Sequence, residues 1–424
     1  MNFTRPISIS ILLAGHVLIL LAVSSETLRP LLPFGAAIAV SGAFLAWKCG
    51  INSLFVILGI ALVLRLSCLG IEDGTLSDDV YRYLWDGEIV TAGSNPFEET
   101  PRALNERGVG DPELFAKLNS PDYFSVYPPV SQGLFALAAF TEFPQLAIRL
   151  LLGISEFAAL LLLARIVQPR LLILYAWNPL VVLETWGQAH TEAALLAVFA
   201  LMLFCLRKRR FSAATAALTL AVWIKLWPIL FLPFLLRHNG WRIRDAAVFI
   251  GLSVAVWLPF QPWSSALNML QSLRLYVDTF EFNAGPYYLL KWITSAFVYG
   301  LDFIPDRDPR LFIGIIVRIA MLFSLAWFFL RRRGWSIERQ LAIVSVIVLL
   351  SLPTIHPWYF LPVFLVFPFI DRIEWAWIWL GVCSAGTYLL YTHGLAIYWV
   401  FVGVGWIGWA LLKIREGIAD KPEP

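Results

Sequence analysis

Apolar segments long enough to cross a membrane recur along almost the whole chain. The composition is 59% hydrophobic and only 14% charged, against about 25% charged residues in soluble proteins. A membrane-spanning helix needs about 20 apolar residues, whereas a β-barrel shows short alternating segments. Since the helical pattern recurs, the sequence predicts an all-α polytopic membrane protein with about 12–14 transmembrane helices.

Composition argues against two classes of function. The net charge is only +3, and no basic cluster has the density of a nucleic-acid footprint, so no nucleic-acid partner is expected. The four cysteines lie in or near apolar segments without CxxC spacing and are expected to be buried small hydrophobic residues: Cys49, Cys68, Cys205 and Cys383. No spacing of His, Asp and Glu predicts a metal site.

Polarity divides the chain into four regions. Residues 1–70 are expected to form N-terminal transmembrane helices, 71–128 a polar loop, 129–415 a transmembrane bundle and 416–424 a tail. The polar loop holds twelve acidic and four basic residues, whereas other turns, such as Arg207 to Arg210, are strongly basic. By the positive-inside rule, the basic turns and the tail are cytoplasmic and the polar loop is extracytoplasmic.

Several apolar segments are interrupted. Asn178-Pro179 falls inside 170–188, which we expect to form two half-helices or a re-entrant turn, because proline breaks the helix and a cavity must then satisfy the backbone. Lys225 to Pro228 should split 211–236 into two short spans, and 286–301 should not cross fully. On this topology the unusual polar motifs share the outer side, as a single active site would require: Asp78-Asp79, Trp186 to His190, Lys225, Asn283 to Tyr288, Ile355 to Tyr359 and Tyr391 to His393.

The adjacent carboxylates Asp78 and Asp79 follow an apolar segment at the start of the polar loop. Such a pair repels itself and titrates as a coupled pair, and it can accept a proton, hold a cation or orient a sugar. The alternative is helix capping, because Ser77 and Asp78 precede a helical stretch. Asp86, two turns further on, is either a substrate-positioning residue or part of a solvated turn.

Lys225 interrupts an apolar segment, where a buried lysine costs about 2.5–3.5 kcal/mol and needs an anionic partner. A lipid phosphate is the functional partner, and Glu156 or Glu184 the structural one. Arg65 and Arg318 also lie in apolar segments and likewise need an anionic partner, either a ligand or a carboxylate of the protein. His190 and His356, at segment ends, are candidates for the site, although a lone histidine is more often a hydrogen-bonded structural group.

Five motifs occur in an order that resembles the bacterial polytopic GT-C glycosyltransferases, the mannosyltransferase-like group that uses polyprenyl-phosphate hexoses. They span about residues 60 to 370: Ser77 to Gly87 with Ala92 to Phe97, Ser125 to Pro129, Trp177-Asn178-Pro179 with Glu184 through Glu192, Lys225 to Pro228, and His356 to Tyr359. Thr191 departs from the group, which often has Asn after the histidine.

The resemblance implies a GT-C fold, with short interfacial helices in the first extracytoplasmic loop, and an inverting displacement. It places the catalytic base on Asp78 or Asp79, with Asp78 favoured, and the donor-phosphate contact on Lys225. His190 and His356 would line the site. The remaining candidates for substrate binding are Arg82, Asp86, Glu192, Arg318 and Tyr359. No cofactor is required, although the acidic pair is compatible with a divalent cation.

The sequence therefore predicts a hexosyltransferase, with mannose as the favoured sugar, in the bacterial inner membrane and with its site facing the periplasm. Its expected partners are a polyprenyl-phosphate-linked sugar donor, a lipid or glycan acceptor and membrane lipids. The alternatives are a transporter or lipid-linked sugar flippase, which would also carry intramembrane charges and broken helices, and a scaffold of envelope synthesis.

Overall fold

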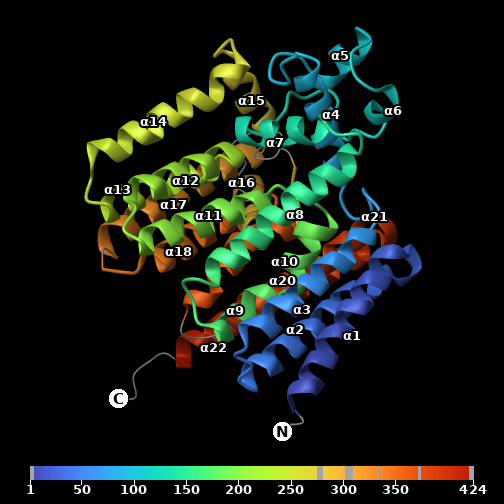
Figure 1. The fold of residues 1–424 in the computed structure, drawn as a ribbon, viewed down its shortest axis with the longest axis vertical. Coiled ribbons are helices and arrows are strands. Elements are labelled where there is room, and N and C mark those ends of the chain that lie inside the picture. The colour runs from blue at the N-terminus through green and yellow to red at the C-terminus, as the bar shows by residue number, and fades with distance from the viewer. Residues whose placement is uncertain (1–3, 275–279, 301–308, 333, 371–373, 420–424) are drawn as a thin grey trace.

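The computed structural model describes residues 4–274, 280–300, 309–332, 334–370 and 374–419 (Figure 1). These residues form helices joined by turns, with one isolated β-bridge between Phe282 and Thr354. The α-helices are α1 (Thr4–Ser24), α2 (Leu32–Lys48), α3 (Leu54–Leu66), α4 (Asp79–Thr91), α5 (Pro101–Glu106), α6 (Pro112–Phe115), α7 (Pro129–Ala139), α8 (Pro144–Leu163), α9 (Pro169–Ala176), α10 (Pro179–Val182), α11 (Glu192–Arg207), α12 (Phe211–Ile224), α13 (Leu232–His238), α14 (Ile243–Trp257), α15 (Ser265–Arg274), α16 (Gly285–Gly300), α17 (Pro309–Arg331), α18 (Ile337–Leu350), α19 (Leu361–Leu365), α20 (Trp375–Ala385), α21 (Leu390–His393) and α22 (Leu395–Ala419).

Within the described residues, six helices are long and apolar enough to cross a membrane. They are Thr4–Ser24, Glu26–Lys48, Pro144–Leu163, Ile243–Phe260, Ile313–Arg331 and Leu395–Glu416. A bent pair would make a seventh, and four further apolar helices are shorter. The structure thus confirms an all-α polytopic membrane protein. The count of about 12–14 spans stays a prediction, because several apolar segments are shorter than the roughly 20 residues that a crossing needs.

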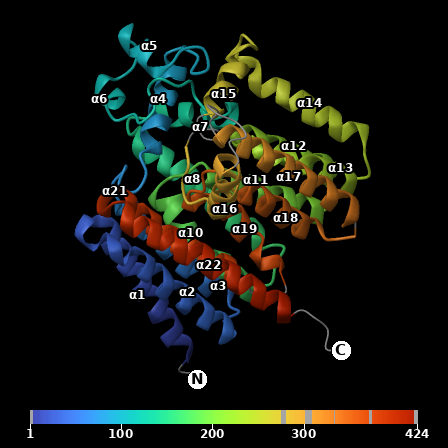
Figure 2. The same cartoon turned by 180° about the vertical axis from the view of Figure 1, so that it is seen from behind.

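Small residues bring the first two helices into close contact. A Cβ added at Gly15 or Gly42 would overlap the facing helix, at Ala39 and Leu12 respectively, so α1 and α2 pack backbone to backbone. On its other side α2 contacts α20, which packs against α22; Figure 2 shows α22 on that face of the bundle.

Arg65 ties three helices together inside the bundle. Its guanidinium donates to both carboxylate oxygens of Glu156 on α8 at 2.7 Å, and to the carbonyl of Ala176 at the end of α9 at 2.8 Å. Both charged side chains are fully buried. Because both Glu156 oxygens face Arg65, that carboxylate is not the counter-ion of Lys225.

The polar loop packs as short helices, α4, α5 and α6, at one end of the bundle, with both chain termini at the other (Figure 1). Asp86 is the buried centre of this loop. It accepts hydrogen bonds from Arg82 Nε at 2.8 Å and from Gln132 Nε2 on α7 at 3.0 Å, and also from the Ser125 hydroxyl. The solvated-turn interpretation of Asp86 is therefore wrong, because its carboxylate is enclosed by protein donors.

The basic turns meet one another. Arg207, the last residue of α11, pairs with Glu338 at 2.7 Å, and Arg237 on α13 donates to Gln340 Oε1 at 3.0 Å. Arg237 also donates to the carbonyl of Phe329. In Figure 1 these contacts lie around α13 and α18, away from α4 to α6. The acidic loop and the basic turns thus occupy different ends of the bundle.

The predicted helix breaks are confirmed. Helix α9 ends at Ala176, and Asn178 Oδ1 caps α10 by accepting from the backbone N–H of Leu180 at 3.0 Å. Likewise α12 ends at Ile224, and a separate short helix, α13, follows Pro228. A further bend of 119°, between Pro179–Gly187 and Glu192–Arg207, was not predicted.

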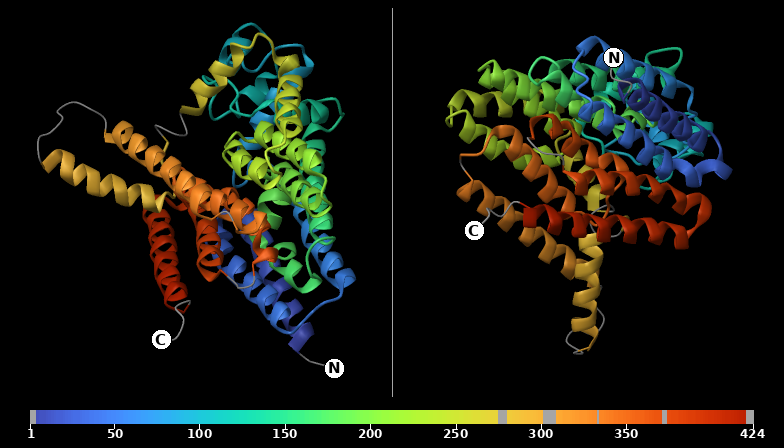
Figure 3. Two further views of the ribbon diagram at one scale, coloured as in Figure 1. Left: turned by 90° about the vertical axis from the view of Figure 1, so that its left-hand side faces the viewer. Right: turned by 90° about the horizontal axis from the view of Figure 1, so that it is seen from below.

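Helix α16 is 16 residues long, or about 24 Å at the usual rise. It is therefore shorter than the roughly 30 Å hydrocarbon core, in line with the prediction that 286–301 does not cross fully. Figure 3 shows it projecting from the body with the first part of α17.

Candidate functional site

The acidic pair lies where α4 begins. Ser77 Oγ accepts from the backbone N–H of Asp79 at 3.4 Å, whereas the Asp78 side chain makes no capping hydrogen bond. Asp78 is exposed, and one of its oxygens accepts from Asn119 Nδ2 at 2.8 Å. Capping alone therefore does not account for Asp78, and the two carboxylates have different surroundings.

Asp79 is half-buried and lies among charged groups from other helices. Burial raises the pKa of its carboxyl above the usual range, because desolvation disfavours the charged form. The His190 and Lys225 side chains oppose this shift in pKa, whereas Asp78 and Glu192 add to it. The structure thus brings together residues that lie more than a hundred positions apart in the sequence.

Lys225 is held at this site by a carboxylate. Its extended backbone follows the end of α12, and its Nζ lies 2.7 Å from Glu192 Oε1, at the start of α11. The predicted structural partners, Glu156 and Glu184, are wrong: Glu156 binds Arg65, and Glu184 faces a histidine. The lysine side chain stays 21% exposed, so its ammonium remains accessible to a second anion.

His190 is fully buried and is oriented by Glu184. Its Nδ1 lies 3.1 Å from Glu184 Oε2 and 3.2 Å from the Glu184 carbonyl oxygen. The Tyr388 hydroxyl donates to the same carboxylate at 2.8 Å. Since Nδ1 faces two acceptors, it donates to them, and Nε2 has no hydrogen-bond partner within the described structure.

Four rings form a stacked column beside the site. Trp358 lies between His190 and His356, with ring centroids 3.7 Å and 4.3 Å away, and Phe282 stacks on His356 at 4.7 Å. Tyr359 meets the column edge-on and lies 5.3 Å beneath Lys225 Nζ. The column brings Phe282, which directly precedes the predicted motif Asn283 to Tyr288, and the His356 motif next to His190.

Several buried polar atoms here make no hydrogen bond within the described structure. They are Glu184 Oε1, Gln188 Nε2, His190 Nε2, Thr191 Oγ1 and Glu192 Oε2. Unsatisfied buried polar groups are uncommon in folded proteins, and each calls for a partner such as water or a ligand. Five such atoms within nine residues mark this segment as a candidate binding site.

Two candidates stand apart from this cluster. Arg82 donates to Asp86 and to the backbone carbonyls of Ser120 and Tyr123, and so orders the polar loop. Arg318 lies on α17, which packs against α16 and α18 and carries none of the cluster residues.

Sequence reasoning missed the contributions of Trp358 and Asn119. Trp358 lies within the motif His356 to Tyr359, and its place between two candidate site residues could have indicated a role in the site. No sequence pattern marks Asn119. In the part of the chain that the structure describes, no group of three or more His, Cys, Asp and Glu side chains is arranged to hold a metal ion.

The part of the chain that carries most of the site is similar to known proteins. Residues 74–239 match a family described as alpha-(1->6)-mannopyranosyltransferase, N-terminal domain. Alpha-(1->6)-mannopyranosyltransferase A of Mycobacterium tuberculosis is 23% identical over 337 residues, which cover 70% of this chain and 62% of that relative. The chain thus spans less than two thirds of the relative it matches. These findings confirm the resemblance predicted from the motifs: the chain is similar to GT-C mannosyltransferases over the segment that carries Asp79, His190 and Lys225.

Proposed function

We propose that the protein is a membrane mannosyltransferase, which transfers a hexose from a polyprenyl-phosphate-linked donor to a lipid or glycan acceptor. One observation carries the proposal: the half-buried Asp79 shares a site with Lys225 and His190, within the segment that resembles mannosyltransferases. That resemblance favours a transferase over the transporter, flippase and scaffold alternatives.

Asp79 is the proposed base. It lies near Lys225 and His190, whereas Asp78 is exposed and bound by Asn119; this reverses the preference for Asp78 that the motif suggests. Asp79 takes the proton of the acceptor hydroxyl while that oxygen attacks the anomeric carbon. The bond from this carbon to the phosphate oxygen breaks, its electron pair leaves on the polyprenyl phosphate, and the configuration inverts. General-base assistance of this kind contributes about 10²–10⁴ in rate.

Lys225 is the proposed phosphate contact. An ammonium carries three donors, and the Glu192 contact uses one of them. The others can reach a phosphate oxygen on which negative charge grows as the bond breaks, and this stabilisation acts on the transition state. His190 Nε2 would form a hydrogen bond with a sugar hydroxyl, and His356 and Tyr359 would line the same pocket.

We also propose that the membrane is the bacterial inner membrane and that the site faces the periplasm. The basic turns gather around α13 and α18, away from the acidic loop, and basic turns favour the cytoplasmic side. A polyprenyl-linked donor fits this sidedness because its lipid tail stays in the bilayer.

The test is sugar transfer by the purified full chain in liposomes, with synthetic polyprenyl-phosphate hexoses offered one at a time. We expect release of polyprenyl phosphate from the mannose donor, a loss of about 10²–10⁴-fold in Asp79→Asn, and a smaller loss in Asp78→Asn. A parallel assay with EDTA tests for a divalent cation. Full activity in Asp79→Asn would overturn the proposed base, and gradient-dependent uptake without transfer would favour a transporter.

A further inference from the structure

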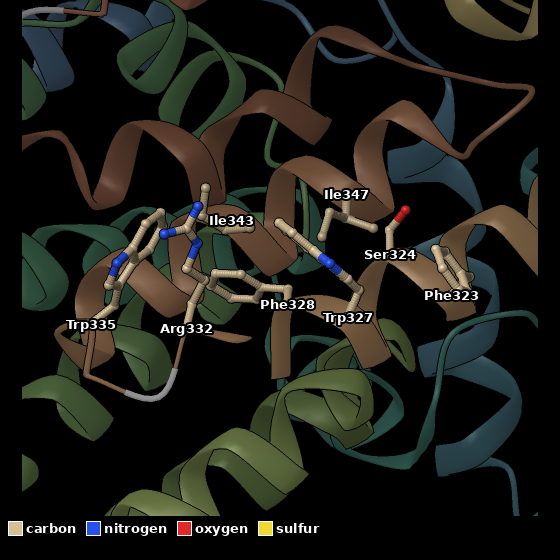
Figure 4. Close-up of a pocket in the computed structure, with 8 residues that line it drawn as sticks. All are labelled: Phe323, Ser324, Trp327, Phe328, Arg332, Trp335, Ile343 and Ile347. Atoms are coloured by element: carbon tan, nitrogen blue, oxygen red, sulfur yellow. The ribbon is translucent and has the colours of Figure 1, made fainter. Parts of the chain in front are cut away.

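A cavity lies between α17 and α18, far from the acidic loop. Its volume is about 370 Å³. Figure 4 shows the lining side chains: Phe323, Ser324, Trp327, Phe328, Arg332, Trp335, Ile343 and Ile347. Phe323 and Trp327 are 71% and 48% exposed, so the cavity opens sideways, toward the bilayer. Its wall is apolar along the helices and cationic at one end.

The cationic end holds two arginines around one indole ring. The Arg332 guanidinium lies 5.0 Å from the centre of the Trp335 ring, and that of Arg339 lies 4.0 Å from it. Trp335 thus keeps Arg339, which does not itself line the cavity, close to Arg332, which does.

Carboxylates nearby do not neutralise these arginines. Glu338 binds Arg207 instead, and no described carboxylate forms an ion pair with Arg332 or Arg339. The cavity therefore joins an apolar slot, open to lipid, to an uncompensated positive charge at the membrane surface.

We propose that this cavity binds an anionic phospholipid, with its phosphate at Arg332 and Arg339 and an acyl chain along Phe323, Trp327 and Ile347. Charge complementarity selects the headgroup, since a zwitterionic lipid adds a cation beside the arginines. The opening toward the bilayer admits the chain.

This lipid site is separate from the proposed donor site. Helix α18 has 14 residues, about 21 Å at the usual rise, and it runs from the Trp335 end toward His356. The arginine end of the lipid site and the donor site thus lie near opposite ends of one helix. A polyprenyl phosphate bound at Lys225 would not reach Arg332 with the same headgroup.

The test is native mass spectrometry of the full chain, titrated with phosphatidylglycerol or with phosphatidylcholine of the same acyl chains. We expect tighter binding of phosphatidylglycerol, weakened about fivefold in Arg332→Gln and about 25-fold in Arg332→Gln/Arg339→Gln, since each basic residue near the surface contributes a factor of about five. Arg244→Gln, which removes an exposed charge from a different basic turn, is the matched control and should bind like wild type.

A second variant tests the slot without touching the charges. Ile347→Trp should fill the cavity and weaken phosphatidylglycerol binding although both arginines remain. Equal binding of the two phospholipids, or wild-type binding by the double arginine variant, would overturn the proposal. Tighter binding of polyprenyl phosphate than of phosphatidylglycerol, lost in the same double variant, would overturn the choice of occupant.

Discussion

Replacing Lys225 by Gln separates the structural role of this residue from its proposed role in catalysis. In the structure its ammonium lies 2.7 Å from Glu192, whose side chain is only 4% exposed. Removing the lysine leaves a buried carboxylate without its partner, which typically costs 3–5 kcal/mol for a fully buried pair. Since Lys225 is 21% exposed, we expect a loss of about 2–3 kcal/mol in the free energy of unfolding.

The double variant Lys225→Gln/Glu192→Gln is the control. Replacing both charges removes the unpaired carboxylate, so most of the stability should return. Activity should not return, because the amide no longer carries the positive charge that stabilises the departing phosphate. A hydrogen bond to a charged group contributes about 1.5–3 kcal/mol, so kcat/KM should stay about 10- to 150-fold below wild type in both variants.

The two quantities require separate assays. Denaturant titration in detergent micelles measures the free energy of unfolding, and release of polyprenyl phosphate in liposomes measures kcat/KM. Recovery of stability and activity together in the double variant would show that Lys225 only neutralises Glu192, and it would refute the proposed phosphate contact.

Three further predictions concern the base, the ring column and the packing. Burial raises the pKa of Asp79 and the base acts when deprotonated, so kcat/KM should rise with pH through that raised pKa. Asp78→Asn removes a neighbouring negative charge and should therefore move this rise to lower pH. A rise in the pH–rate profile that does not move in Asp78→Asn would contradict the assignment of the base. Trp358→Ala should lower kcat/KM by about 10²-fold through misplaced histidines, whereas Trp358→Phe, assayed beside it, should retain most activity; equal activity in the two would contradict a positioning role. Gly285→Ala should lower the free energy of unfolding by about 1–3 kcal/mol, because its Cβ would overlap the Trp406 ring; an unchanged denaturant midpoint would contradict that packing.

The sequence predicts this fold best where one residue imposes a local rule. Asn178-Pro179 and Lys225 to Pro228 end helices because proline lacks the N–H and clashes with the preceding turn, and both breaks occur as expected. The gathering of polar motifs was also predictable, because the topology inferred from the basic turns placed every such motif on one side.

Pairwise partners were not predictable in the same way. Lys225 was expected to need a carboxylate, but which of three glutamates faces it depends on how α8 and α11 rotate about their axes, and packing sets that rotation. The environment of Asp86 was not predictable for a related reason. Its partners Ser125 and Gln132 lie 39 and 46 positions further along the chain, and no local pattern links them to Asp86.

The charged side chains of the site should couple the binding of the donor to the protonation of Asp79. Asp79 lies near two further carboxylates, Asp78 and Glu192, and Lys225 is already paired with Glu192, so an anionic donor enters a region that is rich in negative charge. By thermodynamic linkage, the incoming phosphate raises the proton affinity of Asp79, and donor binding should be accompanied by proton uptake. Affinity then improves as pH falls, while the chemical step improves as pH rises. At limiting donor concentration the rate should therefore follow the ionisation of Asp79 in the free protein, whereas at saturating donor the same rise in rate should shift to higher pH.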